Sequence, residues 1–112
     1  DGGHNINSAI SISNWVKKQS EKVHLICGMM NDKPHKEFVN QFENSVNTIT
    51  LIDIPNQEGS ISKEEFKKKL NNQNIHTAKS IKESLMLNNK DENCIFLCAG
   101  SLYLVGEILN LN

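Results

Sequence analysis

Residues 94–109 have the sequence CIFLCAGSLYLVGEIL, and the expected fold class of the whole chain follows from this segment. Its first five residues are all apolar and come directly after a polar run. An unbroken apolar run of this length predicts a strand buried on both faces, as strands are in a parallel sheet covered by helices. Apolar residues then recur at helical spacing (Leu102, Val105 and Leu109), so we expect an amphipathic helix after a turn at residues 99–101.

The turn between this strand and the expected helix is a candidate ligand site. In open α/β sheets, ligands bind in the crevice outside the carboxyl ends of the strands. Ser101 would cap the helix there, with its hydroxyl and nearby backbone N–H groups directed into the crevice. A plain strand-to-helix turn with a capping serine explains the same residues. The spacing by itself leaves both interpretations open.

The rest of the chain alternates between helical and strand patterns. The expected elements are helices that begin near residues 8, 34, 62 and 80, and strands at 23–29, 48–54, 75–76 and 94–98. Such alternation predicts a three-layer α/β domain with a mostly parallel, Rossmann-like sheet and helices on both faces. A chain of 112 residues is long enough for one such domain, spanning 1–112. The polar residues 1–5 would naturally follow a strand, so we expect the first strand of the domain to be missing.

Two of the helices have a distinctive start. Ser62 with Glu65, and Ser80 with Glu83, have the spacing of a capping box, in which serine and glutamate side chains bond the first free N–H groups of a helix. His35 falls in the first turn of the helix that begins near residue 34, and we expect it to face solvent.

Composition excludes several classes of protein. The formal net charge is −1, whereas a nucleic-acid-binding domain usually carries a basic face. The one basic run, at residues 67–69, is expected on the solvated side of a helix. Cys27, Cys94 and Cys98 lie in apolar segments and indicate reduced thiols in a cytoplasmic protein, with no metal site among them. No segment is long and apolar enough to predict a membrane span or a signal peptide.

Three segments together resemble the C-terminal domain of folylpolyglutamate synthase and the bifunctional dihydrofolate synthase, which are members of the Mur ligase family. Residues 1–5, DGGHN, are similar to the family motif DGAHN. Residues 27–33, CGMMNDK, are similar to a segment of that family that contains Gly-Met-Leu followed by Asp-Lys. Residues 100–105, GSLYLV, are similar to the Gly-Ser-Leu segment that closes the domain.

The resemblance implies an ATP-dependent ligase that adds L-glutamate to dihydropteroate or folate through an acyl phosphate, in folate biosynthesis and one-carbon metabolism. The phosphate-binding loop and the Mg²⁺ ligands of that family belong to a larger N-terminal ATPase domain, and no phosphate-binding loop motif occurs in this chain. We therefore expect no catalytic residue and no metal ligand here. The chain alone should be inactive and should act joined to its N-terminal domain, with no nucleic acid or membrane as a partner.

Four site residues follow from the resemblance. It implies that Asp1 accepts hydrogen bonds from the ribose of ATP and that His4 contacts the phosphates or the incoming glutamate. Asn5 would complete the ATP-binding set by ordering the loop. Ser101 would lie on the glutamate side of the site. The chemistry agrees, since a carboxylate suits ribose hydroxyls and an imidazole suits phosphate or carboxylate oxygens.

Two other functions remain open. One is the C-terminal domain of a cell-wall Mur ligase that acts on a UDP-linked peptide, although those usually have an aromatic residue or cysteine where this chain has Gly2. The other is a stand-alone nucleotide-binding or interaction module of flavodoxin-like design.

Overall fold

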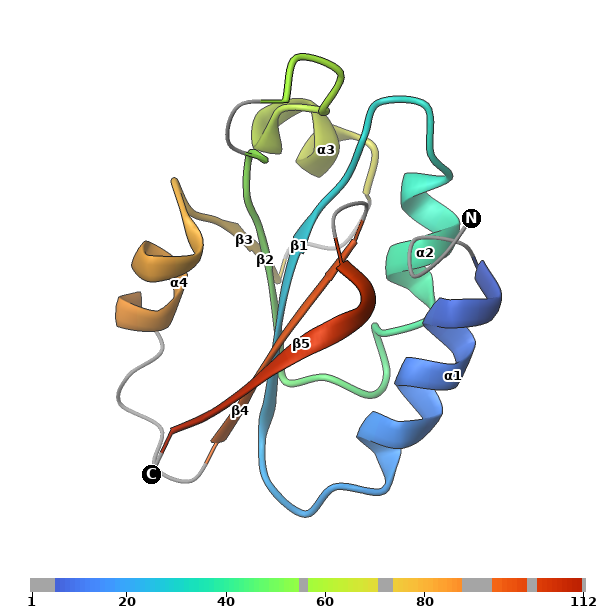
Figure 1. Cartoon of the computed structure of the whole chain (residues 1–112), viewed down its shortest axis with the longest axis vertical. Coiled ribbons are helices and arrows are strands. Elements are labelled where there is room, and N and C mark those ends of the chain that lie inside the picture. The colour runs from blue at the N-terminus through green and yellow to red at the C-terminus, as the bar shows by residue number, and fades with distance from the viewer. Residues whose placement is uncertain (1–5, 55–56, 71–73, 88–93, 101–102, 112) are drawn as a thin grey trace.

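The computed structural model describes residues 6–54, 57–70, 74–87, 94–100 and 103–111. Among them, five strands form a single sheet in the order β3-β2-β1-β4-β5 (Figure 1). The elements in chain order are α1 (Ile6–Lys17), β1 (Val23–Gly28), α2 (His35–Asn40), β2 (Thr48–Leu51), α3 (Lys63–Lys68), β3 (Ile75–Thr77), α4 (Ile81–Leu87), β4 (Cys94–Gly100) and β5 (Tyr103–Leu111). Strands β1 to β4 are parallel to one another, and β5 pairs with β4 in the antiparallel sense.

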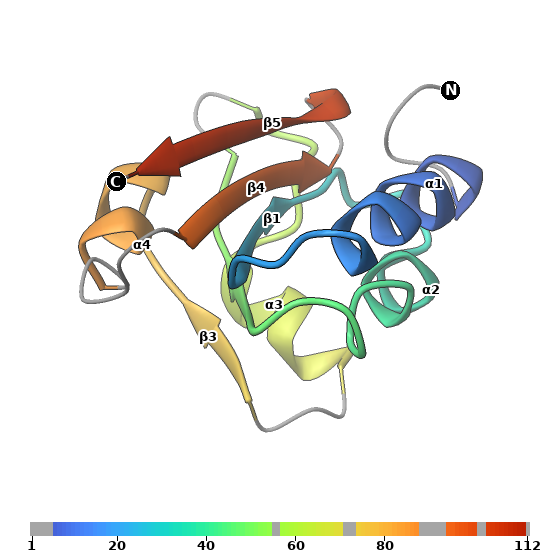
Figure 2. The same ribbon diagram turned by 90° about the horizontal axis from the view of Figure 1, so that it is seen from below.

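Helices cover both faces of this sheet, as the alternating pattern predicts. Figure 2 shows α1 and α2 on one side of the strands and α4 on the other. The central strands β1 and β4 are buried along their full length, which explains their unbroken apolar sequences. The prediction of a mostly parallel, three-layer α/β domain is therefore confirmed.

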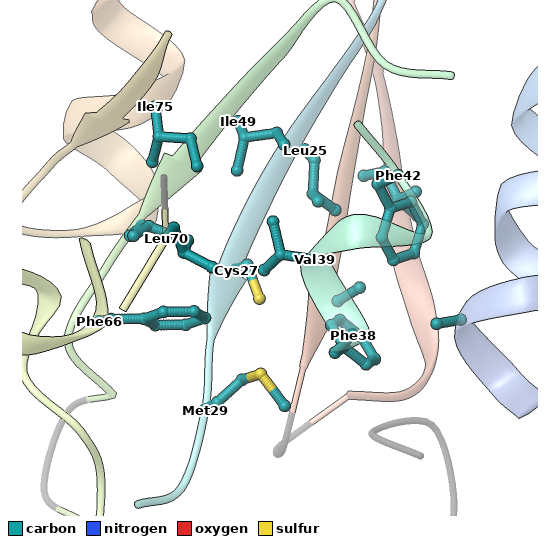
Figure 3. Close-up of a cluster of buried hydrophobic side chains, with 14 of the residues drawn as sticks. Leu25, Cys27, Met29, Phe38, Val39, Phe42, Ile49, Phe66, Leu70 and Ile75 are labelled. Atoms are coloured by element: carbon teal, nitrogen blue, oxygen red, sulfur yellow. The ribbon is translucent and has the colours of Figure 1, made fainter. Parts of the chain in front are cut away.

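The larger of two hydrophobic clusters lies between the sheet and the helices α1, α2 and α3. In Figure 3, side chains of β1 such as Leu25 and Cys27 point toward Phe38 of α2, with Phe66 of α3 beside them. The rings of Phe38 and Phe42 are in contact, with centroids 5.5 Å apart and planes tilted by 50°. The smaller cluster, on the α4 side, contains the buried residues Ile26, Ile52, Ala78, Cys94, Phe96 and Cys98.

The prediction of a helix over residues 102–109 is wrong, because this segment lies in strand β5 (Tyr103–Leu111). A sheet that ended at β4 would leave one edge of that fully buried strand without backbone partners, and pairing with β5 satisfies those groups. Tyr103, Val105 and Ile108 are residue types that favour strands, so the segment is compatible with either structure. Tyr103 of β5 pairs with Gly100 of β4, so a strand and not a helix follows Ser101 in the chain.

Serines begin two of the helices as predicted. Ser62 is the N-cap of α3, and its hydroxyl accepts a hydrogen bond from the backbone N–H of Glu65. The Ser80 hydroxyl accepts one from the N–H of Glu83 at 3.1 Å. The Glu83 carboxylate accepts its bond from the N–H of Lys79 rather than from Ser80, so the second capping box is shifted by one residue.

The three cysteines are buried and form no disulfide, as expected from their apolar surroundings. Burial raises the pKa of the Cys27 thiol, which keeps it protonated and chemically inert. Among the described residues, no helix is long and apolar enough to cross a membrane.

Candidate functional site

The carboxyl ends of β1 and β4 meet at two glycines. Gly28 pairs with Gly100 in the sheet register, and Gly100 has a φ of 137°, a backbone conformation that is almost restricted to glycine. A Cβ atom added at Gly100 would overlap the carbonyl oxygen of Gly28. A Cβ atom added at Gly28 would lie 2.9 Å from Cγ1 of Ile54. The two backbones therefore approach closely at the end of the sheet where ligands bind in this class of fold.

The loop that follows β1 is fixed by backbone hydrogen bonds to a second loop. The carbonyl oxygen of Met29 accepts a bond from the N–H of Ile61 at 3.0 Å, and the N–H of Asn31 donates to the carbonyl of Gly59 at 2.7 Å. Asn31 and Asp32 are exposed beyond this attachment. The segment that resembles the second family motif thus holds polar side chains on a rigid backbone at the rim of the sheet.

His35 is buried, so the expectation that it faces solvent is wrong. Its Nε2 atom lies 2.9 Å from the carbonyl oxygen of Met30, and its ring is 5.2 Å from that of Phe66. Burial lowers the pKa of His35, against the opposing effect of the bond to Met30. A neutral imidazole can donate to this carbonyl, so His35 holds the loop after β1 instead of contacting a ligand.

Asp53, which the sequence analysis did not single out, ties the end of β2 to the start of α3. Its carboxylate accepts a hydrogen bond from the backbone N–H of Lys63 at 2.8 Å and one from the Lys63 ammonium at 2.9 Å. This contact holds the pKa of the Asp53 carboxyl below its usual value and raises the pKa of Lys63. The signal in the sequence was an acidic residue near the end of the strand expected at 48–54, ten residues before a lysine at a helix start.

We expect Asp53→Asn to lower the stability of the domain at neutral pH. The folded state holds the pKa of this carboxyl below its unfolded value of about 4, so its contribution is full above that value and is lost as pH falls through the folded pKa. The difference in unfolding free energy between the parent and Asp53→Asn should therefore shrink in acid. Urea unfolding across a pH series measures this difference in unfolding free energy. Glu58→Gln is the matched control, because the Glu58 side chain is exposed. A difference that grows in acid would contradict this role for Asp53.

The four residues assigned by resemblance, Asp1, His4, Asn5 and Ser101, lie outside the described residues, and their roles stay predictions. Their described neighbours can be placed. Helix α1 runs antiparallel to β1, so it begins toward the end of the sheet at which β1 and β4 finish (Figure 1). Cα atoms of α1 and β5 approach within 8 Å of one another. Residues 1–5 precede α1 in the chain, and Ser101 precedes β5. The two motifs that contain the assigned residues therefore adjoin two elements that lie close to each other.

Metal ions in proteins are held by clusters of side chains. Within the described part of the chain, no three His, Cys, Asp or Glu side chains gather closely enough to hold an ion. The exposed side chains of Asn31 and Asp32 offer an amide and a carboxylate at the rim.

A mostly parallel sheet with helices on both faces defines an α/β domain, and a tight glycine pair lies at the carboxyl ends of its two central strands. A family model described as "Mur ligase, glutamate ligase domain" matches residues 1–102. The chain belongs to the Mur ligase family, which confirms the resemblance found in its motifs. Comparison with curated proteins found no match.

Solved structures with a similar fold include proteins from two organisms. The chain superposes on a bifunctional folylpolyglutamate synthase/dihydrofolate synthase from Yersinia pestis, crystallised with AMPPNP and Mn ion, with a TM-score of 0.76, 17% identity and 94% of the chain covered. The match to a Mycobacterium tuberculosis folylpolyglutamate synthase complexed with ADP has a TM-score of 0.61, 11% identity and 80% coverage. The chain spans 26% of the first of these proteins and 21% of the second.

Proposed function

We propose that the chain is the C-terminal domain of an ATP-dependent ligase that adds L-glutamate to dihydropteroate or a folate. One observation carries the proposal: the family match runs from residue 1 to residue 102 and so includes Asp1, His4, Asn5 and Ser101. The structures that resemble the chain are folylpolyglutamate synthases, which favours a folate substrate over a cell-wall precursor. The three cysteines form no disulfide, which favours a cytoplasmic enzyme.

The proposed reaction needs an activated carboxylate, because a carboxylate at neutral pH is a poor electrophile. ATP, bound with Mg²⁺ mainly by an N-terminal ATPase domain, supplies the phosphate that turns a carboxylate oxygen into a leaving group. The task of the C-terminal domain is to position the reactants. Asp1 accepts hydrogen bonds from the ribose hydroxyls, and Asn5 orders the loop around it. Ser101 donates a hydrogen bond to a carboxylate oxygen of glutamate, and His4 donates one to the phosphates of ATP or to the glutamate carboxylate, which leaves the glutamate amine free to attack.

The test uses the full-length protein that carries this domain. We expect it to incorporate labelled glutamate into dihydropteroate or tetrahydrofolate, with one ADP formed for each amide bond. Absence of incorporation with both acceptors, from a protein that is folded, would contradict the proposed substrate class.

Replacing His4 with alanine should lower turnover in the full-length enzyme and leave its thermal unfolding unchanged. The physical reason is the loss of a polar contact to phosphate or glutamate. The measurement is the kcat/KM for ATP and for glutamate, with His76→Ala, an exposed histidine on β3, as the control. If His4→Ala kept full activity, the proposed contact of His4 with phosphate or glutamate would be wrong.

Ser101→Ala should act mainly on the KM for glutamate, because its hydroxyl is proposed to contact this substrate alone. No capping loss accompanies the change, since strand β5 rather than a helix follows this residue. Steady-state kinetics with ATP and glutamate varied separately will distinguish the two sites. An increase in the KM for ATP, with the KM for glutamate unchanged, would contradict the assignment.

A further inference from the structure

A pocket of about 430 Å³ lies beside the free edge of the sheet, away from the glycine pair at the ends of β1 and β4. Its lining residues are Thr50, Lys67, His76, Thr77 and Leu87. They come from β2, α3, β3 and α4, and β3 is the outermost strand on this side (Figure 2). The volume falls within the range of about 300–1,000 Å³ that is typical of sites for small molecules. Neither the family motifs nor the proposed function uses these residues.

The sheet register explains how the pocket forms. Ile26, Thr50 and His76 are aligned across β1, β2 and β3, so their side chains share one face of the sheet. Helix α4 covers the inner end of this row, where Ile81 and Leu85 pack against the cluster that contains Ile26. The outer end of the row, at Thr50 and His76, borders the pocket instead.

Thr50 is the unusual member of this set. It is only 1% exposed and lines the pocket, yet no hydrogen bond joins its hydroxyl to any residue that the structure describes. The threonine two residues earlier behaves differently, since the Thr48 hydroxyl lies 2.7 Å from Nδ1 of His24. Because the Thr50 side chain borders the pocket, its hydroxyl can donate a hydrogen bond to a polar group of a ligand there.

The charge of the pocket indicates the kind of ligand. Lys67 brings an ammonium group, His76 an imidazole and Thr50 a hydroxyl donor, and no Asp or Glu is among the described lining residues. Phosphate and carboxylate oxygens accept hydrogen bonds from all three groups. Leu87, which is 59% exposed at the end of α4, offers an apolar contact.

We propose that this pocket binds a small molecule through an oxyanion, a phosphate or carboxylate group held by Thr50, Lys67 and His76. The bound group accepts a hydrogen bond from the Thr50 hydroxyl and pairs with the Lys67 ammonium. Leu87 packs against the carbon skeleton of the ligand. This site is independent of the proposed ligase reaction.

The experiment titrates the isotopically labelled 112-residue chain with inorganic phosphate and, separately, with succinate, and follows backbone amide resonances by NMR. We expect saturable shifts at Thr50 and His76 with at least one of the two anions. The anion that binds with the lower dissociation constant shows whether the pocket prefers a phosphate or a carboxylate group. Lys67→Met should weaken binding about tenfold, which corresponds to about 1.4 kcal/mol, and Thr50→Val should do the same.

Lys68→Met is the matched control, because Lys68 is the next residue of the same helix, is exposed and does not line the pocket. Lys67 is also exposed, so its replacement tests the site even if Thr50→Val disturbs the fold. Two results would overturn the proposal: no saturable shift at the pocket with either anion, or equal weakening by Lys67→Met and Lys68→Met, which would indicate a general effect of charge.

Discussion

Gly100→Ala is expected to destabilise the domain by about 3 kcal/mol or more, with a melting temperature lowered by more than about 10 °C. Two costs combine at this position. An alanine is strained at a φ of 137°, and its Cβ atom would overlap the carbonyl oxygen of Gly28 on the neighbouring strand. Backbone at the centre of a sheet cannot move aside as the end of a long side chain can, so we expect β1 and β4 to separate at this end.

Gly59→Ala is the matched control for Gly100→Ala. A Cβ atom at Gly59 would meet only Cε of Met30, at 2.8 Å, and the end of a methionine side chain can rotate away. Its cost should therefore be small, within about 1 kcal/mol. Urea unfolding of both variants gives the comparison. If Gly100→Ala were as stable as Gly59→Ala, the close approach of the two strands would not exist as described.

Phe38→Ala should cost about 3–5 kcal/mol, because it removes a large side chain from the centre of the main cluster. Phe38 is completely buried between α2 and the sheet, against Phe42 and close to side chains of β1 (Figure 3). The surrounding groups belong to strands that are fixed by pairing on both sides, so they cannot collapse fully into the space. Urea unfolding measures the loss.

Two further variants make the result specific to packing. Lys36→Ala, on the exposed side of the same helix, should change the unfolding free energy by less than about 0.5 kcal/mol. Phe38→Leu, which keeps most of the apolar volume, should lie between Lys36→Ala and Phe38→Ala. A cost for Phe38→Ala no larger than that of Lys36→Ala would mean that α2 does not pack as described.

Residues 94–98 and 103–109 show why part of the fold could be predicted and part could not. Five consecutive apolar residues can be buried only in an element that is covered on both sides, so the strand and the class of sheet followed from the sequence. The next apolar residues fit a helix and a strand equally well. Pairing with the edge of β4 decided between them, and that edge is a feature of the assembled sheet.

His35 and Asp53 show the same division within the candidate site. A histidine in the first turn of a helix is usually exposed, and only the position of Phe66 and of the Met30 carbonyl makes this one buried. Asp53 and Lys63 are ten residues apart, and their contact depends on how α3 returns to the end of β2. By contrast, the Ser62 cap is a contact within three residues, and the sequence predicted it correctly.

The sequence by itself determined the α/β class, the buried strands, the reduced thiols and the family, because these depend on side-chain character and on short motifs. The tertiary structure alone decided the strand order, the antiparallel β5, the glycine pair at the end of the sheet and the pocket beside β3. Each of these brings together groups that are far apart in the chain. Such contacts depend on the geometry of the whole sheet, which no local pattern specifies.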